Sequence, residues 1–131
     1  MGQQQLLLVI LGVIVVGISI AVGMLMFEAY SIQSNKDAMI SDLENITANA
    51  RAYFVKPGRM GGGDNSYTNY AIPLKLANTE NGHYTCTSSA IRVFFTAVSA
   101  NNPANRMQVT LQRYNHGEGL LISWTYTGDF Q

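Results

Sequence analysis

Charged side chains are scarce in this sequence and absent from its beginning. Lysine, arginine, aspartate and glutamate make up 12% of the 131 residues, about half of the usual share, and the first of them is Glu28. The eight basic and eight acidic residues cancel. We therefore expect no nucleic-acid partner, because such partners attract strongly basic proteins.

Residue clusters that carry chemistry are also missing. The single cysteine, Cys86, excludes an internal disulfide. The two histidines, His83 and His116, fall in predicted turns, and we favour solvated turn residues over a metal site at His116 and Glu118. The glycines at 61–63 lack the Gly-Lys-Ser/Thr of a phosphate-binding loop. We expect no enzyme, no catalytic residue, no metal and no cofactor.

What the sequence does contain is a run of 22 uncharged, mostly apolar residues at 6–27. A helix of that length spans roughly 33 Å, enough to cross the hydrocarbon core of a bilayer. A cleaved secretory signal is disfavoured, because a basic first region and a small-residue cleavage site are both missing. Residues 1–5 also lack the Lys or Arg that orients a membrane helix, so we expect that a basic leader preceded Met1 and was removed.

Small residues punctuate this run at Gly12, Gly17, Ser19 and Gly23. Glycine weakens a helix by roughly 1 kcal/mol relative to alanine, so the presence of three glycines in one helical segment calls for a structural explanation. Small residues let helices approach closely in an apolar medium, and Ser19 and Gly23 have the small-xxx-small spacing. We favour helix–helix packing, and local unwinding between Gly12 and Gly23 is a compatible second use.

The helix is predicted to continue through residues 28–56, since neither proline nor glycine occurs until Pro57. Apolar residues recur there at helical spacing and form one stripe. We expect this stripe to pack on the rest of the chain through Ile32, Met39, Leu43, Ile46, Ala50 and Tyr53. Asn45-Ile46-Thr47 makes Asn45 a candidate glycosylation site, although a chance match is favoured.

The remaining residues favour a sheet. Residues 57–69 are predicted to form a flexible, glycine-rich connector, and β-branched and aromatic residues dominate 70–131. The expected antiparallel sheet has three to four strands, drawn from residues 70–76 at an edge, 84–98, 107–114 and 120–127. The sequence thus predicts an α+β fold, in which a long N-terminal helix, apolar and then amphipathic, packs on a C-terminal antiparallel sheet.

This layout resembles that of type IV pilins. Processed pilins begin with Phe or Met, carry a polar fifth residue and then run apolar, as Met1, Gln5 and the stretch from Leu6 do here. The family usually has Glu at the fifth position, so Gln5 retains a hydrogen-bonding group but loses the charge. The apolar helix also lacks the family's proline, and no cystine staples the C-terminal region.

The resemblance implies removal of a leader by a prepilin peptidase, N-methylation of Met1 and subunit docking through Gln5. It further implies a homopolymer built from the inner membrane by an assembly machinery, which becomes an extracellular cell-surface filament, or fimbrium. The residues expected to pack in the filament core are Leu6, Leu8, Ile10, Gly12, Ile14, Gly17, Ser19 and Gly23.

Two alternatives remain open at this point. The chain could be a pseudopilin or minor pilin of a secretion system, or a single-pass membrane-anchored binding module that never polymerises. The sequence is compatible with several roles for a pilus-like fibre: cell adhesion, motility, DNA uptake and electron transfer.

Overall fold

The computed structural model describes residues 2–113 and 120–131. Contacts within the chain divide it into two units, Met1–Ser34 and Asn35–Gln131. The first unit is the N-terminal part of helix α1. The second unit contains the rest of α1 and a sheet, and we call it the head.

Helix α1 runs from Gly2 to Val55 and is 54 residues long, close to the length predicted. It ends where the sequence predicts an end, because the proline ring at 57 removes a backbone donor and disfavours helical geometry in the preceding residue. The last helical hydrogen bond joins Lys56 N to the carbonyl of Ala52 over 3.1 Å.

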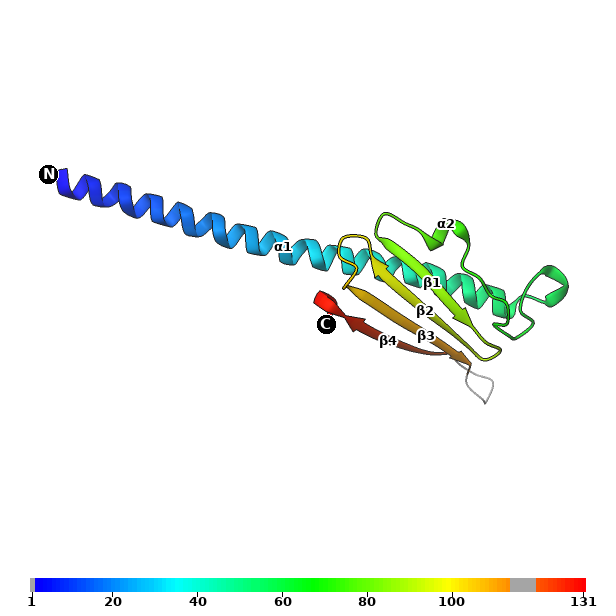
Figure 1. Ribbon diagram of the computed structural model, residues 1–131. Coiled ribbons are helices and arrows are strands. Elements are labelled where there is room, and N and C mark those ends of the chain that lie inside the picture. Colours follow the sequence, from blue (N-terminus) through cyan, green and yellow to red (C-terminus); the bar gives the residue numbers. More distant parts are fainter. Residues whose placement is uncertain (1, 114–119) are drawn as a thin grey trace. The chain divides into compact units, whose positions relative to one another are not determined.

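The head has one sheet of four antiparallel strands in the order β1-β2-β3-β4, and Figure 1 shows the second half of α1 lying along it. The predicted α+β arrangement, a long apolar N-terminal helix with a four-stranded antiparallel sheet, is confirmed. The strands are β1 (Gly82–Ser88), β2 (Arg92–Ser99), β3 (Arg106–Arg113) and β4 (Leu120–Thr127). The short elements are η1 (Gly58–Met60), α2 (Leu74–Ala77) and η2 (Gly128–Phe130).

The core lies between α1 and one face of the sheet. Alternate residues of β2 and β3 point into it, and their register places Phe95 opposite Val109 and Ala97 opposite Met107. These side chains are fully buried. Each large apolar side chain buried in this way stabilises the fold by about 1.5–3 kcal/mol relative to an exposed one, so the stripe on α1 and the sheet hold each other in place.

The prediction of one long strand over residues 84–98 was wrong, because the chain turns back at residues 89–91 to form the β1–β2 hairpin. Ser89 N donates to the carbonyl of Arg92 over 2.7 Å, and Arg92 N donates to Ser89 Oγ over 3.2 Å. A serine hydroxyl can close a turn by bonding to nearby backbone. The turn contains no glycine, proline or asparagine, so its sequence resembles that of a strand.

The predicted edge strand at residues 70–76 was also wrong, since residues 74–77 form helix α2 instead. The carbonyl of Pro73 accepts hydrogen bonds from Leu76 N at 2.8 Å and Ala77 N at 3.0 Å. Proline favours this start, because its fixed φ suits the beginning of a helix. Tyr70 turns inward and is 5% exposed.

The glycine-rich connector is folded back onto the end of α1 rather than extended. Gly63 N donates to the carbonyl of Tyr53 at 2.7 Å, and Asn65 N donates to that of Phe54 at 2.8 Å. The last carbonyls of a helix have no hydrogen-bond donors inside the helix. Here backbone N–H groups of the connector donate to them. Tyr67, in the second half of the connector, is fully buried and lies against Phe54 with ring centroids 4.7 Å apart.

We predict that Gly63→Ala lowers the stability of the head by roughly 1–3 kcal/mol, the usual effect of forcing extra atoms into a packed site. A Cβ at Gly63 overlaps the carbonyl of Ser66 and lies 2.8 Å from Cε1 of Tyr53. Thermal unfolding of the full chain in detergent micelles, followed by circular dichroism, measures the effect.

Gly58→Ala is the matched control, because its nearest neighbour is Asp64 Cβ at an ordinary 3.8 Å. Equal melting temperatures for the two variants contradict the close approach at Gly63.

Candidate assembly surface

The first unit presents an apolar surface on every side. The large apolar side chains of residues 6–27 are between 49% and 77% exposed. An 18-residue window of α1 has a mean hydropathy of 3.0, and none of it is buried within the chain. By length and composition, this helix is able to cross a membrane. The side chains predicted for the filament core all lie on this surface, and nothing in the described chain covers them.

The glycines of this segment are not required by any contact within the chain. A Cβ added at Gly12, Gly17 or Gly23 meets no atom within 4 Å. The backbone stays helical through all three positions, so unwinding is not seen in the single chain. Ser19 Oγ donates to the carbonyl of Val15 over 2.8 Å, which satisfies its hydroxyl without a partner outside the helix.

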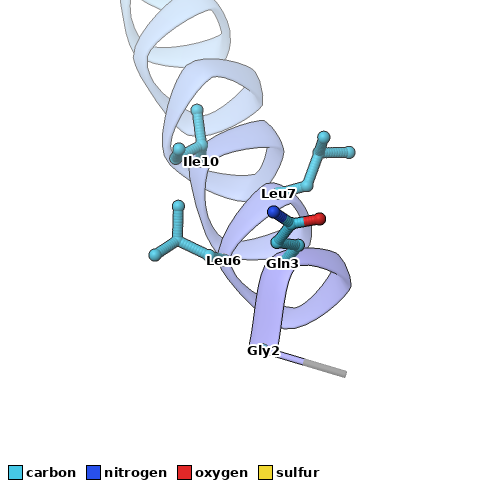
Figure 2. Close-up of a pocket in the computed structure, with 5 residues that line it drawn as sticks. All are labelled: Gly2, Gln3, Leu6, Leu7 and Ile10. Carbon is cyan, nitrogen blue, oxygen red and sulfur yellow. The ribbon is translucent and has the colours of Figure 1, made fainter.

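Near the start of α1 the side chains leave a shallow hollow. It is lined by Gly2, Gln3, Leu6, Leu7 and Ile10, and Figure 2 shows the amide of Gln3 among the three apolar side chains. An amide that both donates and accepts suits a polar contact inside an apolar packing surface. The sequence points to Gln5 as the docking residue, whereas the glutamine that lines the hollow is Gln3; the run of three glutamines at 3–5 is the signal for it. Gln5 is exposed and does not line the hollow.

The end of the apolar segment is aromatic. Phe27 and Tyr30 are 77% and 71% exposed, and Tyr30 lines a second hollow with Met26, Ala29 and Gln33. Aromatic side chains gather where a membrane helix meets the water interface. Phe27 directly precedes the first charge, Glu28, and Tyr30 follows it by two residues, which fits such a boundary.

In the head, the structure fully buries four of the six side chains expected to pack on the sheet: Met39, Leu43, Ile46 and Ala50. Tyr53 is half-buried, and its hydroxyl donates to the carbonyl of Thr68 over 2.8 Å. Ile32 is partly exposed and belongs to the first unit.

A polar cluster that the sequence analysis missed joins α1 to the sheet at Asp42. Its Oδ2 accepts hydrogen bonds from Tyr84 Oη at 2.8 Å, Thr79 Oγ1 at 2.8 Å and Asn81 Nδ2 at 2.9 Å. Tyr84 belongs to β1, and the other two donors lie in the turn that precedes it. Hydrogen bonds to a charged acceptor are the stronger kind, so Asp42 fixes this turn on the helix.

Opposing effects set the pKa of Asp42. Partial burial raises the pKa of this carboxyl. The hydrogen bonds from Asn81, Tyr84 and Thr79 together lower the pKa by more than burial raises it, so the net pKa lies below the ordinary value. Burial also raises the pKa of Tyr84 well above the usual range, and the bond to Asp42 adds to this. The cluster is therefore an ionised carboxylate held by neutral donors at neutral pH.

The glycosylation candidate Asn45 is exposed on α1. The next two residues of its motif are not available, because Ile46 is fully buried and Thr47 is 7% exposed. Thr47 Oγ1 donates to the carbonyl of Glu44 over 2.9 Å. In the folded head the side chain of Asn45 is therefore exposed, but the other two residues of its glycosylation motif are buried.

Several predicted residues lie outside the described part of the chain. These are Met1, the expected site of processing and methylation, and the turn at 115–119 with His116 and Glu118. Within residues 2–113 and 120–131, no three His, Cys, Asp or Glu side chains gather as metal ligands.

Comparison with known proteins adds nothing to this geometry: no family model, no curated protein and no solved structure matches the chain.

We predict that Asp42→Asn destabilises the head at neutral pH by roughly 1 kcal/mol, the usual contribution of a lost hydrogen bond. Because folding lowers the pKa of Asp42, the stability it contributes is present above the unfolded value of about 4 and is lost as the pH falls through the folded value. The difference in melting temperature between wild type and Asp42→Asn therefore shrinks as the pH falls below about 4.

Glu44→Gln, at an exposed carboxylate on the same helix, is the control and should leave the neutral-pH melting temperature unchanged. A gap between wild type and Asp42→Asn that stays constant down to acid pH rules out the charged acceptor.

Proposed function

We propose that this chain is the structural subunit of a type IV pilus-like filament, and that its first unit is the polymerising element. One observation carries the proposal: the described residues of the chain leave the uncharged helical surface of residues 6–27 uncovered on every side. Such a surface is stable only in lipid or among other apolar surfaces. Before assembly the inner membrane covers it, and in the extracellular filament other copies of the same helix do.

The energy of this burial explains why a filament of this kind is stable outside the cell. An apolar area on the order of 2,000 Å² per helix, at about 25 cal/mol per Å², corresponds to roughly 50 kcal/mol relative to water. Relative to lipid the gain is far smaller, because lipid tails are as apolar as leucine. Moving the helix from membrane to filament therefore needs an assembly machinery.

The small residues favour polymerisation over simple anchoring. A Cβ added at Gly12, Gly17 or Gly23 would meet no atom of the described chain within 4 Å. A plain membrane anchor has no use for three residues that weaken a helix. Close approach of neighbouring helices gives them a purpose. Gln3 and Gln5 add amide groups that can bond to a neighbour without the desolvation of a charge.

The resemblance to type IV pilins, including the prepilin peptidase and N-methylation of Met1, belongs to this proposal. A pseudopilin or minor pilin shares the same assembly surface and differs only in the length of the polymer. A non-polymerising membrane-anchored module is the contrasting candidate.

Shearing native cells tests the proposal directly. Filaments dominated by a band at the chain's mass of 14.3 kDa support a major subunit. Native material that yields only detergent-soluble monomers contradicts it and supports the membrane-anchored module.

We predict that Gly17→Leu strongly reduces filament yield while membrane insertion stays intact, because the added side chain separates helices that must approach closely. Sheared-filament yield and membrane fractionation of the same cells measure the two effects. Val16→Leu is the matched control, since Val16 is already a large side chain and is 58% exposed. Normal filaments from Gly17→Leu contradict close packing at this position.

We predict that Gln5→Glu changes filament yield but leaves the melting of the head unchanged, because residue 5 lies in the first unit. A carboxylate adds a charge interaction to the docking site and also raises the desolvation penalty. Quantitative shearing of cells that express each variant provides the measurement, and Gln5→Ala tests the amide itself. If neither substitution alters the yield, Gln5 has no docking role.

A further inference from the structure

The sheet of the head has one covered face and one open face. In β2, Val93 and Phe95 are fully buried against α1, whereas Arg92 and Phe94 are exposed, because successive side chains of a strand point to opposite faces. Figure 1 shows α1 along one side of the sheet only. We call the side that carries Arg92 and Phe94 the outer face.

Phe94 is an aromatic ring set among hydroxyl and amide groups. It is 44% exposed, and the strand register places Thr87 of β1 and Thr110 of β3 directly opposite it. The same face continues to β4, where Ser123 pairs with Thr110. In the described part of the chain, the side chains of Thr110 and the nearby Gln108 have no hydrogen-bond partner. Such groups both donate and accept, so they are available to a ligand.

The charges of the sheet are of one sign. The four strands contain three arginines and no Asp or Glu. Arg92 lies two residues before Phe94 on the outer face, about 7 Å along the strand. Its guanidinium forms no ion pair with a carboxylate of the described residues. The outer face therefore offers an unpaired cation beside an exposed ring.

We propose that the outer face binds an acidic polysaccharide, with one sugar ring stacked on Phe94 and the carboxylate of a uronic acid held by Arg92. A sugar ring has an apolar C–H face and a rim of hydroxyls, which match an aromatic ring surrounded by threonine and glutamine. The planar guanidinium binds a carboxylate through two parallel hydrogen bonds. A flat strand surface suits an extended chain, whereas small ligands occupy concave pockets.

Nucleic acid, another anionic polymer, fits this face less well. Double-stranded DNA carries one charge per ~1.7 Å and is held by clustered lysines and arginines. On the outer face, Arg106 lies opposite Val98, six residues along β2 from Arg92 and thus about 20 Å away. Two distant cations with an aromatic ring between them match a polymer whose charges are farther apart.

This site belongs to a single head and needs no polymer. If the first unit polymerises as proposed, the outer face is repeated along the filament, and many weak contacts act together on one polysaccharide chain. Only this repetition rests on the proposed function. Binding is therefore tested with monomers, so that its failure is distinct from a failure to form filaments.

The full-length chain in non-ionic detergent micelles should bind immobilised alginate, a polyuronate, and should bind dextran, a neutral polysaccharide, far more weakly. Biolayer interferometry at physiological salt measures both. Absence of binding to alginate, or equal binding to the two polysaccharides, overturns the proposal and leaves the result of shearing unaffected. Tighter binding to immobilised double-stranded DNA than to alginate assigns the face to nucleic acid and also overturns it.

Substitution of Arg92 tests the carboxylate contact. Arg92→Gln should weaken binding to alginate roughly tenfold, as expected for lost hydrogen bonds to a charged group. Arg59→Gln removes the same charge from an exposed position outside the sheet and should bind as the wild type does. An equal loss in both variants indicates attraction to net charge alone and contradicts a site at Arg92.

Substitution of Phe94 tests the stacking contact. Phe94→Leu keeps a large apolar side chain without a ring and should weaken binding several-fold, whereas Phe94→Tyr should retain it. Leu74→Ala, at an apolar residue that is 88% exposed outside the strands, is the control, and equal melting temperatures show that the variants are folded. Wild-type affinity in folded Phe94→Leu contradicts stacking. Should Phe94→Leu not fold, the effect of Arg92→Gln still decides the proposal.

Discussion

Burial of one continuous apolar helix is the constraint on which the rest of this structure depends. Helix α1 is apolar on all sides in its first half and on one stripe in its second half. A sheet of four strands covers the stripe, so the head has a core of buried apolar side chains. Within the described residues the first half has no such cover, and we propose lipid and other copies of the helix as its partners. The chain is thus folded at one end and dependent on association at the other.

Two features of the head keep the amphipathic half of α1 in place beyond simple apolar packing. The Asp42 carboxylate gathers a tyrosine of β1 and the turn before it onto the helix. At the end of α1, the glycine-rich connector folds back and bonds to the last carbonyls. Each feature supplies hydrogen-bond partners to polar groups near a buried surface: the Asp42 carboxylate in one case and the last helix carbonyls in the other. Without them these groups would remain unpaired. The helix is therefore held by hydrogen bonds at two places, Asp42 and its C-terminal end.

The two edges of the sheet differ within the described part of the chain. One edge is occupied by the chain's own turn and by α2, while the other edge presents β4 with its stacked Trp124 and Tyr126.

The sequence by itself determined the features that depend on composition and period. The uncharged run at 6–27, the helix up to Pro57 and the alternation in β3 and β4 are properties of short windows, so the long helix and the α+β class followed from them. The apolar stripe was visible in the same way, and Met39, Leu43, Ile46 and Ala50 are buried.

Only the tertiary structure decided where the chain turns and which polar groups meet. The turn at 89–91 is closed by a serine hydroxyl within a sequence typical of strands, and residues 74–77 form a helix because Pro73 begins it and Tyr70 is drawn into the core. Asp42 finds its partners about 40 residues away. Such contacts depend on the three-dimensional path of the backbone, which local periodicity does not encode.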